Sequence, residues 1–486
     1  MVNQLEQFRI DLHELLAYRS DTLLDLLDAL SSNSSAQSVI ELSLSPFFRR
    51  EYSSITDGID NFFQASEEEK EGEKRREWEQ DLVRVIAPYI PCPQERDFWL
   101  FGIDVTPQLR PFAKTLADRT YVYQPNTVKG NKPVNIGHQS SVLAYLPEKG
   151  EKTAPWLVPL NVRRVSSEKK KNEVGSEQVK ALFSDEKLPF NGKLKVLVGD
   201  SDYSARTFLG VIYGDEADEE GKKKSDDQVA IVRSSGNRSF YHAPPEIEGK
   251  NPVGHPKWYG DPFRLSDKTT WGQPDEEEWT TWTTHRGKEY DVQLRGWHNV
   301  RMTGKKDYAM HKHPFTLIRA DVFDKEGKRV FKRPMWLIVM GKRRTEVSLI
   351  ESWEAYGQRV DLEHYFRFGK QKLLFTAYQT PDVEHEENWG QIVQLAYIFL
   401  WLAAEHVQDL PRPWEKPAPQ VEAEIASPSR SQRGFAGIIS QFGTPAKAPK
   451  PRDYSPGRTK GEKPGPRKRH AVIKKGQKSQ KSHPTA

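Results

Sequence analysis

Residues 351–375 place one carboxylate among cations and a phenol at regular spacing. In a helix, with about 100° between successive side chains, a single face presents Tyr356, Arg359, Glu363, Arg367 and Lys370. The carboxylate of such a face can bind a metal ion while the cations hold phosphate oxygens. Opposite charges at i, i+4 are also common on solvated helices, so the face alone leaves both interpretations open.

Two aspartates upstream end short apolar runs that are typical of β-strands. Asp104 ends the run FWLFGID, and Asp200 ends KVLVGD. A strand-end Asp often only caps a turn, so neither residue alone identifies a site. Asp202 competes with Asp200 by proximity, but the apolar run points to Asp200. Together with Glu363, the two aspartates would supply the oxygen ligands that a pair of Mg²⁺ ions about 4 Å apart requires.

The gaps between Tyr356, Arg359, Glu363 and Lys370 are two, three and six residues. This order resembles the Tyr-Arg-Glu-Lys signature of one large branch of the DDE-type transposases of bacterial insertion sequences. The region after Asp104, with its Arg-Pro and Asp-Arg pairs, resembles the surroundings of the first aspartate of that family. Asp200, followed three residues later by an aromatic residue, resembles the second aspartate. The resemblance covers most of residues 97–405.

The resemblance implies an RNase H-like catalytic core in which Asp104, Asp200 and Glu363 are the catalytic, metal-binding residues. Two Mg²⁺ ions would be the cofactors, and Mn²⁺ can substitute for them. The implied reaction is hydrolysis at a transposon end to give a free 3′-OH, which then attacks target DNA. The DNA-binding residues would be Tyr356, Arg359, Arg367 and Lys370.

The partners implied by the resemblance are double-stranded DNA, as terminal inverted repeats and as target, and a second copy of the chain in the DNA-bound complex. Two alternatives stay open. One is an RNase H-like DNA nuclease that cleaves without strand transfer. The other is a catalytically inactive, DNA-binding descendant.

The elements that would position these residues are expected to make an α/β protein with an RNase H-like mixed sheet. Helical spacing of leucines predicts an all-helical N-terminal unit, where relatives bind the terminal repeats. A crossover helix is expected within 166–187 and a hairpin around DKEG at 324–327. The expected units are 1–90, helical; 91–224, first part of the core; 225–330, β-rich insertion; 331–410, second part of the core; and 411–486, a disordered basic tail.

The charge of the chain is concentrated at its C-terminal end. The formal net charge is +5, whereas residues 444–486 contain 13 Lys and Arg against 2 Asp and Glu. Everything before residue 444 is therefore net acidic. A basic, Pro- and Gly-rich segment of this kind should bind phosphates without base selectivity, or act as a solubilising arm.

Composition limits the classes of protein to which the chain can belong. The single cysteine, Cys92, cannot form an intrachain disulfide, and the N-terminus lacks the pattern of a signal peptide. The longest apolar run is too short to span a bilayer. We therefore expect a cytoplasmic protein without a membrane partner. The resemblance further implies a prokaryotic protein that lies on the nucleoid when bound to DNA.

Several aromatic and histidine residues have two interpretations. In relatives, aromatic residues of the insertion grip a base flipped from the cleaved end, for which the candidates are Trp271, Trp279, Trp282 and Trp297. Tryptophan in a β-rich segment usually belongs to the core. His138, His311 and His313 are expected to be hydrogen-bonded structural residues.

Overall fold

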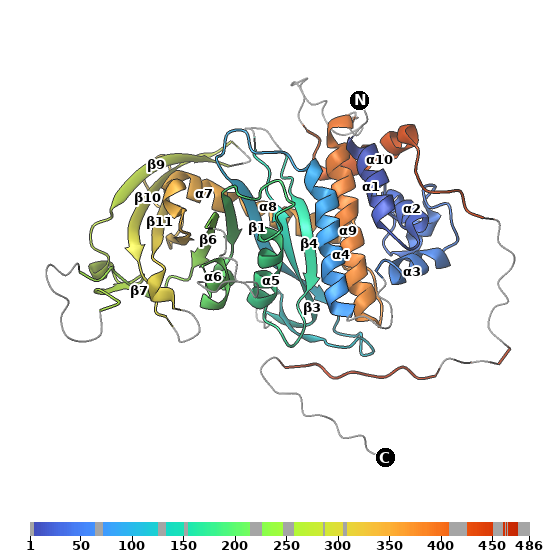
Figure 1. Cartoon of the computed structure of the whole chain (residues 1–486), viewed down its shortest axis with the longest axis horizontal. Helices are drawn as coiled ribbons and strands as arrows, with labels where there is room; N and C mark the ends of the chain where they lie inside the picture. Colours follow the sequence, from blue (N-terminus) through green and yellow to red (C-terminus); the bar gives the residue numbers. More distant parts are fainter. Residues whose placement is uncertain are drawn as a thin grey trace, which may run out of the picture.

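The computed structural model describes ten stretches of the chain. These are residues 4–63, 71–124, 133–149, 154–213, 226–245, 257–284, 287–304, 309–407, 425–450 and 460–474, the last without 462 and 464. They form a mixed α/β protein with helices at both ends of the chain and one large sheet between them (Figure 1).

The helices fall into an N-terminal group, a pair inside the sheet-forming region and a C-terminal group. They are α1 (Gln4–Leu15), α2 (Ser20–Ser31), α3 (Ser53–Asp60), α4 (Glu71–Ile86), α5 (Lys171–Phe183), α6 (Arg206–Tyr213), α7 (Leu349–Gln358), α8 (Val360–Lys372), α9 (Val383–Ala403) and α10 (Pro428–Phe442). The expected helical N-terminal part and the expected crossover helix, α5, are confirmed.

Ten strands form one mixed sheet, and two more form a small separate sheet. The ten strands are β1 (Trp99–Leu109), β2 (Thr120–Tyr123), β3 (Val134–Tyr145), β4 (Val158–Arg164), β5 (Lys195–Gly199), β6 (Gln228–Ser234), β9 (Glu276–Thr283), β10 (Glu289–Val300), β11 (Phe315–Phe323) and β12 (Met335–Met340). The small sheet pairs β7 (Ser239–Tyr241) with β8 (Pro262–Arg264).

The large sheet runs β2-β3-β1-β5-β6-β12-β11-β10-β9, and β4 also pairs with β3. Strands β1, β5 and β6 are parallel to one another, whereas every other pairing is antiparallel. The strands of the expected β-rich insertion therefore extend the same sheet that contains β1 and β5, apart from the β7–β8 pair. The hairpin around residues 324–327 is confirmed as the connection between β11 and β12.

Helix α9 joins the N-terminal helices to the sheet. It is apolar around most of its circumference, which is the pattern of a helix buried on all sides. It packs on β4 and contacts α1, α2, α3 and α10, so it lies between the sheet and the N-terminal helices (Figure 1). This arrangement explains why the run near residue 392 is so apolar although no helix in the described part of the chain is long and apolar enough to span a membrane.

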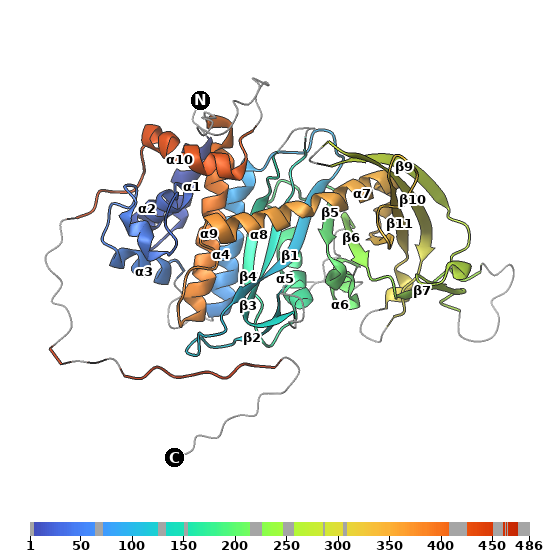
Figure 2. The same ribbon diagram turned by 180° about the vertical axis from the view of Figure 1, so that it is seen from behind.

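Side-chain alternation along β1 sends neighbouring residues to opposite faces of the sheet. A Cβ on Gly102 would meet the Leu362 side chain of α8, and one on Gly175 of α5 would meet Ile103 of β1. Helices α8 and α5 therefore pack on opposite faces of β1. Asp104, two residues after Gly102, shares the face that α8 covers. Figure 2 shows α8 and α7 crossing the strands of the sheet on this side.

The expectation of a disordered tail over 411–486 is wrong for part of that range. Residues 428–442 form α10, whose apolar side chains Phe435, Ile438 and Ile439 are buried at helical spacing. Overall polarity hid this short amphipathic stripe. Farther on, Ile473 pairs with Thr120 at β2, and the His470 amide donates to the Lys114 carbonyl. Residues 411–424, 451–459 and 475–486 of the expected tail lie outside the described residues.

The long helix expected between Val347 and Phe375 is two helices. Arg359 separates α7 from α8, with backbone angles close to helical (φ −52°, ψ −24°). The two helices continue in roughly the same direction (Figure 2). The predicted shared face therefore extends over two helices that meet at Arg359, its first cation.

Candidate active site

Asp104 lies within β1, where the pairing with β5 stops. The expectation that Asp104 ends its strand is wrong, because β1 continues to Leu109 along β3. The parallel pairing with β5 ends one residue earlier, at Ile103 and Gly199. The Asp104 side chain is 16 % exposed, and one of its oxygens accepts from the Val105 amide at 2.7 Å.

Asp200 follows β5 directly and is the neighbour of Asp104 across the sheet. The pairing of Ile103 with Gly199 places the two aspartates beside each other, each one residue beyond the last pair. Asp200 also caps the short helical turn Ser201–Ser204, because its Oδ1 accepts from the Asp202 amide at 2.9 Å. The capping role and a role in a site are compatible, because each carboxylate has several lone-pair positions.

Arg359 connects the first aspartate to the glutamate. Its Nη1 donates to Asp104 Oδ2 at 2.6 Å and its Nη2 donates to Glu363 Oε1 at 2.8 Å. Because Arg359 stands at the junction of α7 and α8, one guanidinium joins carboxylates from β1 and from α8. Three of the predicted residues therefore meet in space: Asp104, predicted from the end of an apolar run and the family resemblance, and Arg359 and Glu363, predicted from their spacing on one helix.

The charges of this group are strongly coupled. Burial raises the pKa of Asp104 to about 6, with Arg359 opposing the rise and the neighbouring Asp200 adding to it. Burial works against the charge of Arg359, but Asp104, Tyr356 and Glu363 outweigh it and raise the pKa of the guanidinium. The carboxylates of Asp104 and Glu363 thus share a single guanidinium, that of Arg359.

Tyr203, the aromatic residue three positions after Asp200, packs under the turn that Asp200 begins and holds it in place. Its side chain is fully buried and packs edge-on against Phe208, with ring centroids 4.9 Å apart. Gly199 and Gly175 leave the room for this ring, since a Cβ on either would lie about 3 Å from it. The ring thus fixes the turn that follows Asp200 against α5.

The remaining members of the predicted helix face differ in exposure. Tyr356 is buried beside Arg359, which lies 5.8 Å from the centre of its ring, and Arg367 is exposed. Lys370 is half-buried, and burial lowers its pKa. Arg359 is the one cation of this face that an observed ion pair joins to the carboxylates.

The carboxylates do not form a complete metal site as they stand. Across the described stretches of the chain, no three His, Cys, Asp or Glu side chains lie close enough together to hold a metal ion. The chemistry of the set suits a hard cation, because Asp104 and Asp200 are adjacent oxygen donors. Glu363 is held by the Arg359 guanidinium, which occupies the place of a cation between Asp104 and Glu363.

Two cations near the site were not found from the sequence. Lys171, in the first turn of α5, forms an ion pair with Asp202. Its positive charge also opposes the rise that burial causes in the pKa of Asp104. Burial raises the pKa of Tyr356, and the positive charge of Arg233, near the end of β6, partly offsets that rise. A charged residue inside the apolar run VAIVRS was a usable signal for Arg233. No spacing rule could have identified Lys171, because it depends on where α5 meets β5.

The tryptophans, the remaining histidines and the cysteine lie away from the carboxylates in the sequence and differ in exposure. Trp271 and Trp297 are buried, and they pack with Trp336. Trp279 and Trp282 are exposed on edge strand β9. His311 is buried and stacks on Trp258, with ring centroids 3.9 Å apart, whereas His313 is part of the loop before β11. Cys92 is exposed.

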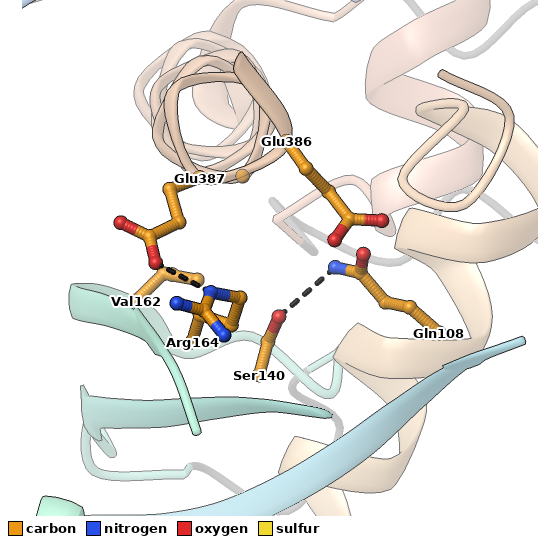
Figure 3. A pocket seen from close by; sticks show the side chains of 7 residues that line it. Gln108, Ser140, Val162, Arg164, Glu386 and Glu387 are labelled. Carbon is orange, nitrogen blue, oxygen red and sulfur yellow. Dashed lines mark hydrogen bonds and ion pairs between the residues drawn. The ribbon is translucent and has the colours of Figure 1, made fainter. Parts of the chain in front are cut away.

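A polar cluster lies apart from the carboxylates, between β1, β3, β4 and α9. In Figure 3, Arg164 donates to Glu387 and Gln108 donates to Ser140. His138 contacts the buried carboxylate of Glu386, which also pairs with Arg110. His138 is thus hydrogen-bonded and structural, as expected. The cluster ties α9 to the sheet.

Comparison with known proteins does not place the chain in a family. No model of a protein family matches the sequence, and a search of curated proteins finds no significant relative.

Proposed function

We propose that the protein is a DDE-type DNA transposase that cleaves transposon ends and joins the 3′-OH to target DNA by two-metal-ion phosphoryl transfer. The observation that carries the proposal is the meeting of Asp104, Arg359 and Glu363, with Asp200 adjacent to Asp104. These residues are at most 259 positions apart in the sequence, and they are among the residues to which the resemblance assigns catalytic or DNA-binding roles.

The sheet supports the proposal at the level of fold. The part β4-β3-β1-β5-β6 has three antiparallel strands followed by two that are parallel to β1. Omitting the short β2, Asp104 lies on the first strand of this set and Asp200 follows the fourth. This is the arrangement that an RNase H-like core requires, with α8 bringing Glu363 to the same place.

Asp104 and Asp200 would hold Mg²⁺, or Mn²⁺ in its place, and Glu363 would complete the ligand set after exchanging Arg359 for the metal. Bound there, a pair of ions would activate the attacking oxygen and stabilise the leaving oxygen of a phosphodiester. The chain itself supplies a rigid pair of strands for the aspartates and a helix for the glutamate. Arg359, once released, is positioned to hold a phosphate oxygen.

The cations around the carboxylates would position DNA. Arg367 is exposed on α8, Lys370 is half-buried one turn later, and Arg233 lies close to Tyr356. Contacts of this kind hold the phosphate backbone without reading base sequence. Double-stranded DNA, as terminal repeats and as target, is the proposed substrate, and a dimer of the chain is the proposed DNA-bound form.

The test is a reaction with the DNA that borders the coding region. The purified chain, a labelled duplex carrying either border and a supercoiled target plasmid are incubated with Mg²⁺. We expect cleavage at the border and covalent joining of its 3′ end to the plasmid. Glu363→Gln should retain border binding and lose cleavage, because it removes one metal ligand without changing the helix.

The products separate the alternatives. Cleavage without joined products would favour an RNase H-like nuclease that lacks strand transfer. Binding without cleavage, equal for the wild type and Glu363→Gln, would favour a catalytically inactive DNA-binding protein. Absence of both binding and cleavage on both borders would contradict the proposal.

A further inference from the structure

Two arginines beyond Asp200 converge without a carboxylate between them. Arg238 lies just before β7, and its Nη1 donates to the Ser204 carbonyl at 3.0 Å and to Ser204 Oγ at 2.8 Å. Its Nη2 lies 3.5 Å from Met302 Sδ. Arg206, the first residue of α6, donates to the hydroxyl of Thr303, the residue next to Met302. Both side chains are half-buried.

This pair differs from most buried and half-buried arginines among the described residues. Arg9, Arg84, Arg163 and Arg359, for example, each contact a carboxylate. Within the stretches that the structure describes, Arg206 and Arg238 have contacts only with neutral groups. Burial lowers the pKa of Arg238 to about 10, and the charge of Arg206 adds to that effect. Two like charges held together in this way leave an unbalanced positive potential.

The two arginines lie next to the turn that follows Asp200. Ser204 is the last residue of the turn that Asp200 caps, so the Arg238 guanidinium is one short turn from the second aspartate. The cations of the predicted helix face lie elsewhere: Arg359 at the junction of α7 and α8, and Arg367 and Lys370 on α8. The two arginines therefore add a second set of donors that reaches the site through another element.

We infer that Arg206 and Arg238 form a phosphate-binding subsite that holds a backbone phosphodiester of the DNA on the Asp200 side of the active site. A phosphate offers several acceptor oxygens and the negative charge that two adjacent guanidinium groups lack. The inference rests on the proposed function for its ligand, but the anion subsite itself rests only on the two arginines and their surroundings.

The decisive variant is Arg206→Gln, because among the described residues the Arg206 guanidinium donates only to the Thr303 hydroxyl, so the change disturbs few contacts. Arg238→Lys is the second variant, since it keeps a charge while removing the forked contact to Ser204. Arg264→Gln is the matched control, because Arg264 is an exposed arginine on neighbouring strand β8. Melting temperatures identify any variant that fails to fold.

The first measurement is binding of a fluorescent duplex of about 30 base pairs over a range of KCl concentrations. Arg206→Gln should weaken binding by about tenfold at low salt and reduce the slope of log K against log salt by about one. Arg264→Gln should bind as the wild type does. The second measurement is the rise in melting temperature caused by inorganic pyrophosphate, which Arg206→Gln should lose.

The two measurements separate failure of the subsite from failure of the proposed function. If Arg206→Gln matches Arg264→Gln in affinity, salt slope and pyrophosphate response, the subsite is refuted whether or not the wild type cleaves DNA. If the wild type binds no DNA but its pyrophosphate response depends on Arg206, the anion subsite is supported and the transposase proposal fails.

Discussion

Arg359 sets the charge balance at the residue scale. It pairs with Asp104 and Glu363 at once, so the two carboxylates share one cation that belongs to the chain. A metal ion would have to displace this guanidinium from at least Glu363. The exchange would free a cation beside the phosphodiester that the metal attracts, and so would couple metal binding to DNA positioning.

The stability of the metal-free protein should depend on pH through Asp104. Its pKa in the folded chain is about 6, above the ordinary value of 3.8. Between these values the folded state keeps a proton that the unfolded state releases, so the contribution is present at low pH and is lost as pH rises through 6. The loss corresponds to about 3 kcal/mol at most.

Asp104→Asn should remove this dependence, because the amide resembles the neutral acid. Urea unfolding with a chelator at about pH 4.5 and pH 7 measures it. The wild type should lose more stability than Asp104→Asn as the pH rises. Parallel losses for the two proteins would show that Asp104 has an ordinary pKa.

Arg359 and Glu363 could be predicted from their spacing along one helix, and Asp104 and Asp200 from the ends of apolar runs together with the family resemblance. The convergence of these four residues needs only the order of strands and one helix. Lys171, Arg206 and Arg238 could not be predicted, because their relation to Asp200 depends on where α5, α6 and β7 pack. These contacts join separate helices and strands, and no repeating pattern in the sequence relates one of these elements to another.

At the scale of elements, the approach of α8 to β1 controls the distance between Asp104 and Glu363. Gly102 makes this approach possible, because a Cβ there would lie 2.9 Å from Leu362 Cδ1 and 3.1 Å from Leu146 Cδ1. Leu362 precedes Glu363, and Gly102 shares a face with Asp104. The contact between Gly102 and Leu362 therefore controls how closely Glu363 approaches Asp104.

Gly102→Ala should destabilise the protein by about 1 to 3 kcal/mol through overpacking and should reduce border cleavage more than DNA binding. Gly357→Ala is the matched change, since Gly357 has open space around it and lies in α7. It should be neutral or stabilising by up to about 1 kcal/mol. Chemical denaturation compares the two, and equal stabilities would contradict the packing argument.

Helix α10 was missed because its apolar stripe is short and lies in a polar sequence. Phe435 is fully buried and stacks on Phe399 of α9, with ring centroids 6.4 Å apart. Phe435→Ala should therefore cost about 3 to 5 kcal/mol of unfolding free energy. Ser440→Ala, at an exposed position of the same helix, is the control. A loss below about 1 kcal/mol for Phe435→Ala would mean that α10 does not pack on α9 in solution.

At the scale of the whole molecule, one sheet joins the strands that carry the aspartates to the strands of residues 276–340. Strands β6 and β12 connect the two parts without a break in hydrogen bonding. The sequence indicates β6, β10, β11 and β12 as strands but not β9, and it predicts a β-rich insertion because aromatic content and turns change near residue 225. Local composition does not reveal whether two sets of strands share one sheet.

The basic C-terminal residues should add affinity for DNA without selectivity. Ending the chain after Lys450 removes 11 Lys and Arg against 2 Asp and Glu. The truncated protein should bind duplex DNA more weakly at low salt, with a shallower salt dependence, while keeping any preference for the border sequence. Competition between border and unrelated duplexes measures this. A lost preference with unchanged total affinity would assign these residues to sequence recognition instead.

The most direct test of the central claim is Mn²⁺ binding followed by electron paramagnetic resonance, with and without duplex DNA. The account predicts that the wild type binds Mn²⁺ and that Asp104→Asn and Asp200→Asn each lose most of it. DNA should increase Mn²⁺ binding by the wild type, because a phosphate can take Arg359 from Asp104 and Glu363. Glu363→Gln should lose this increase, because it lacks the α8 carboxylate that the release of Arg359 frees. Equal Mn²⁺ binding by the wild type and all three variants would contradict a metal site built from these carboxylates.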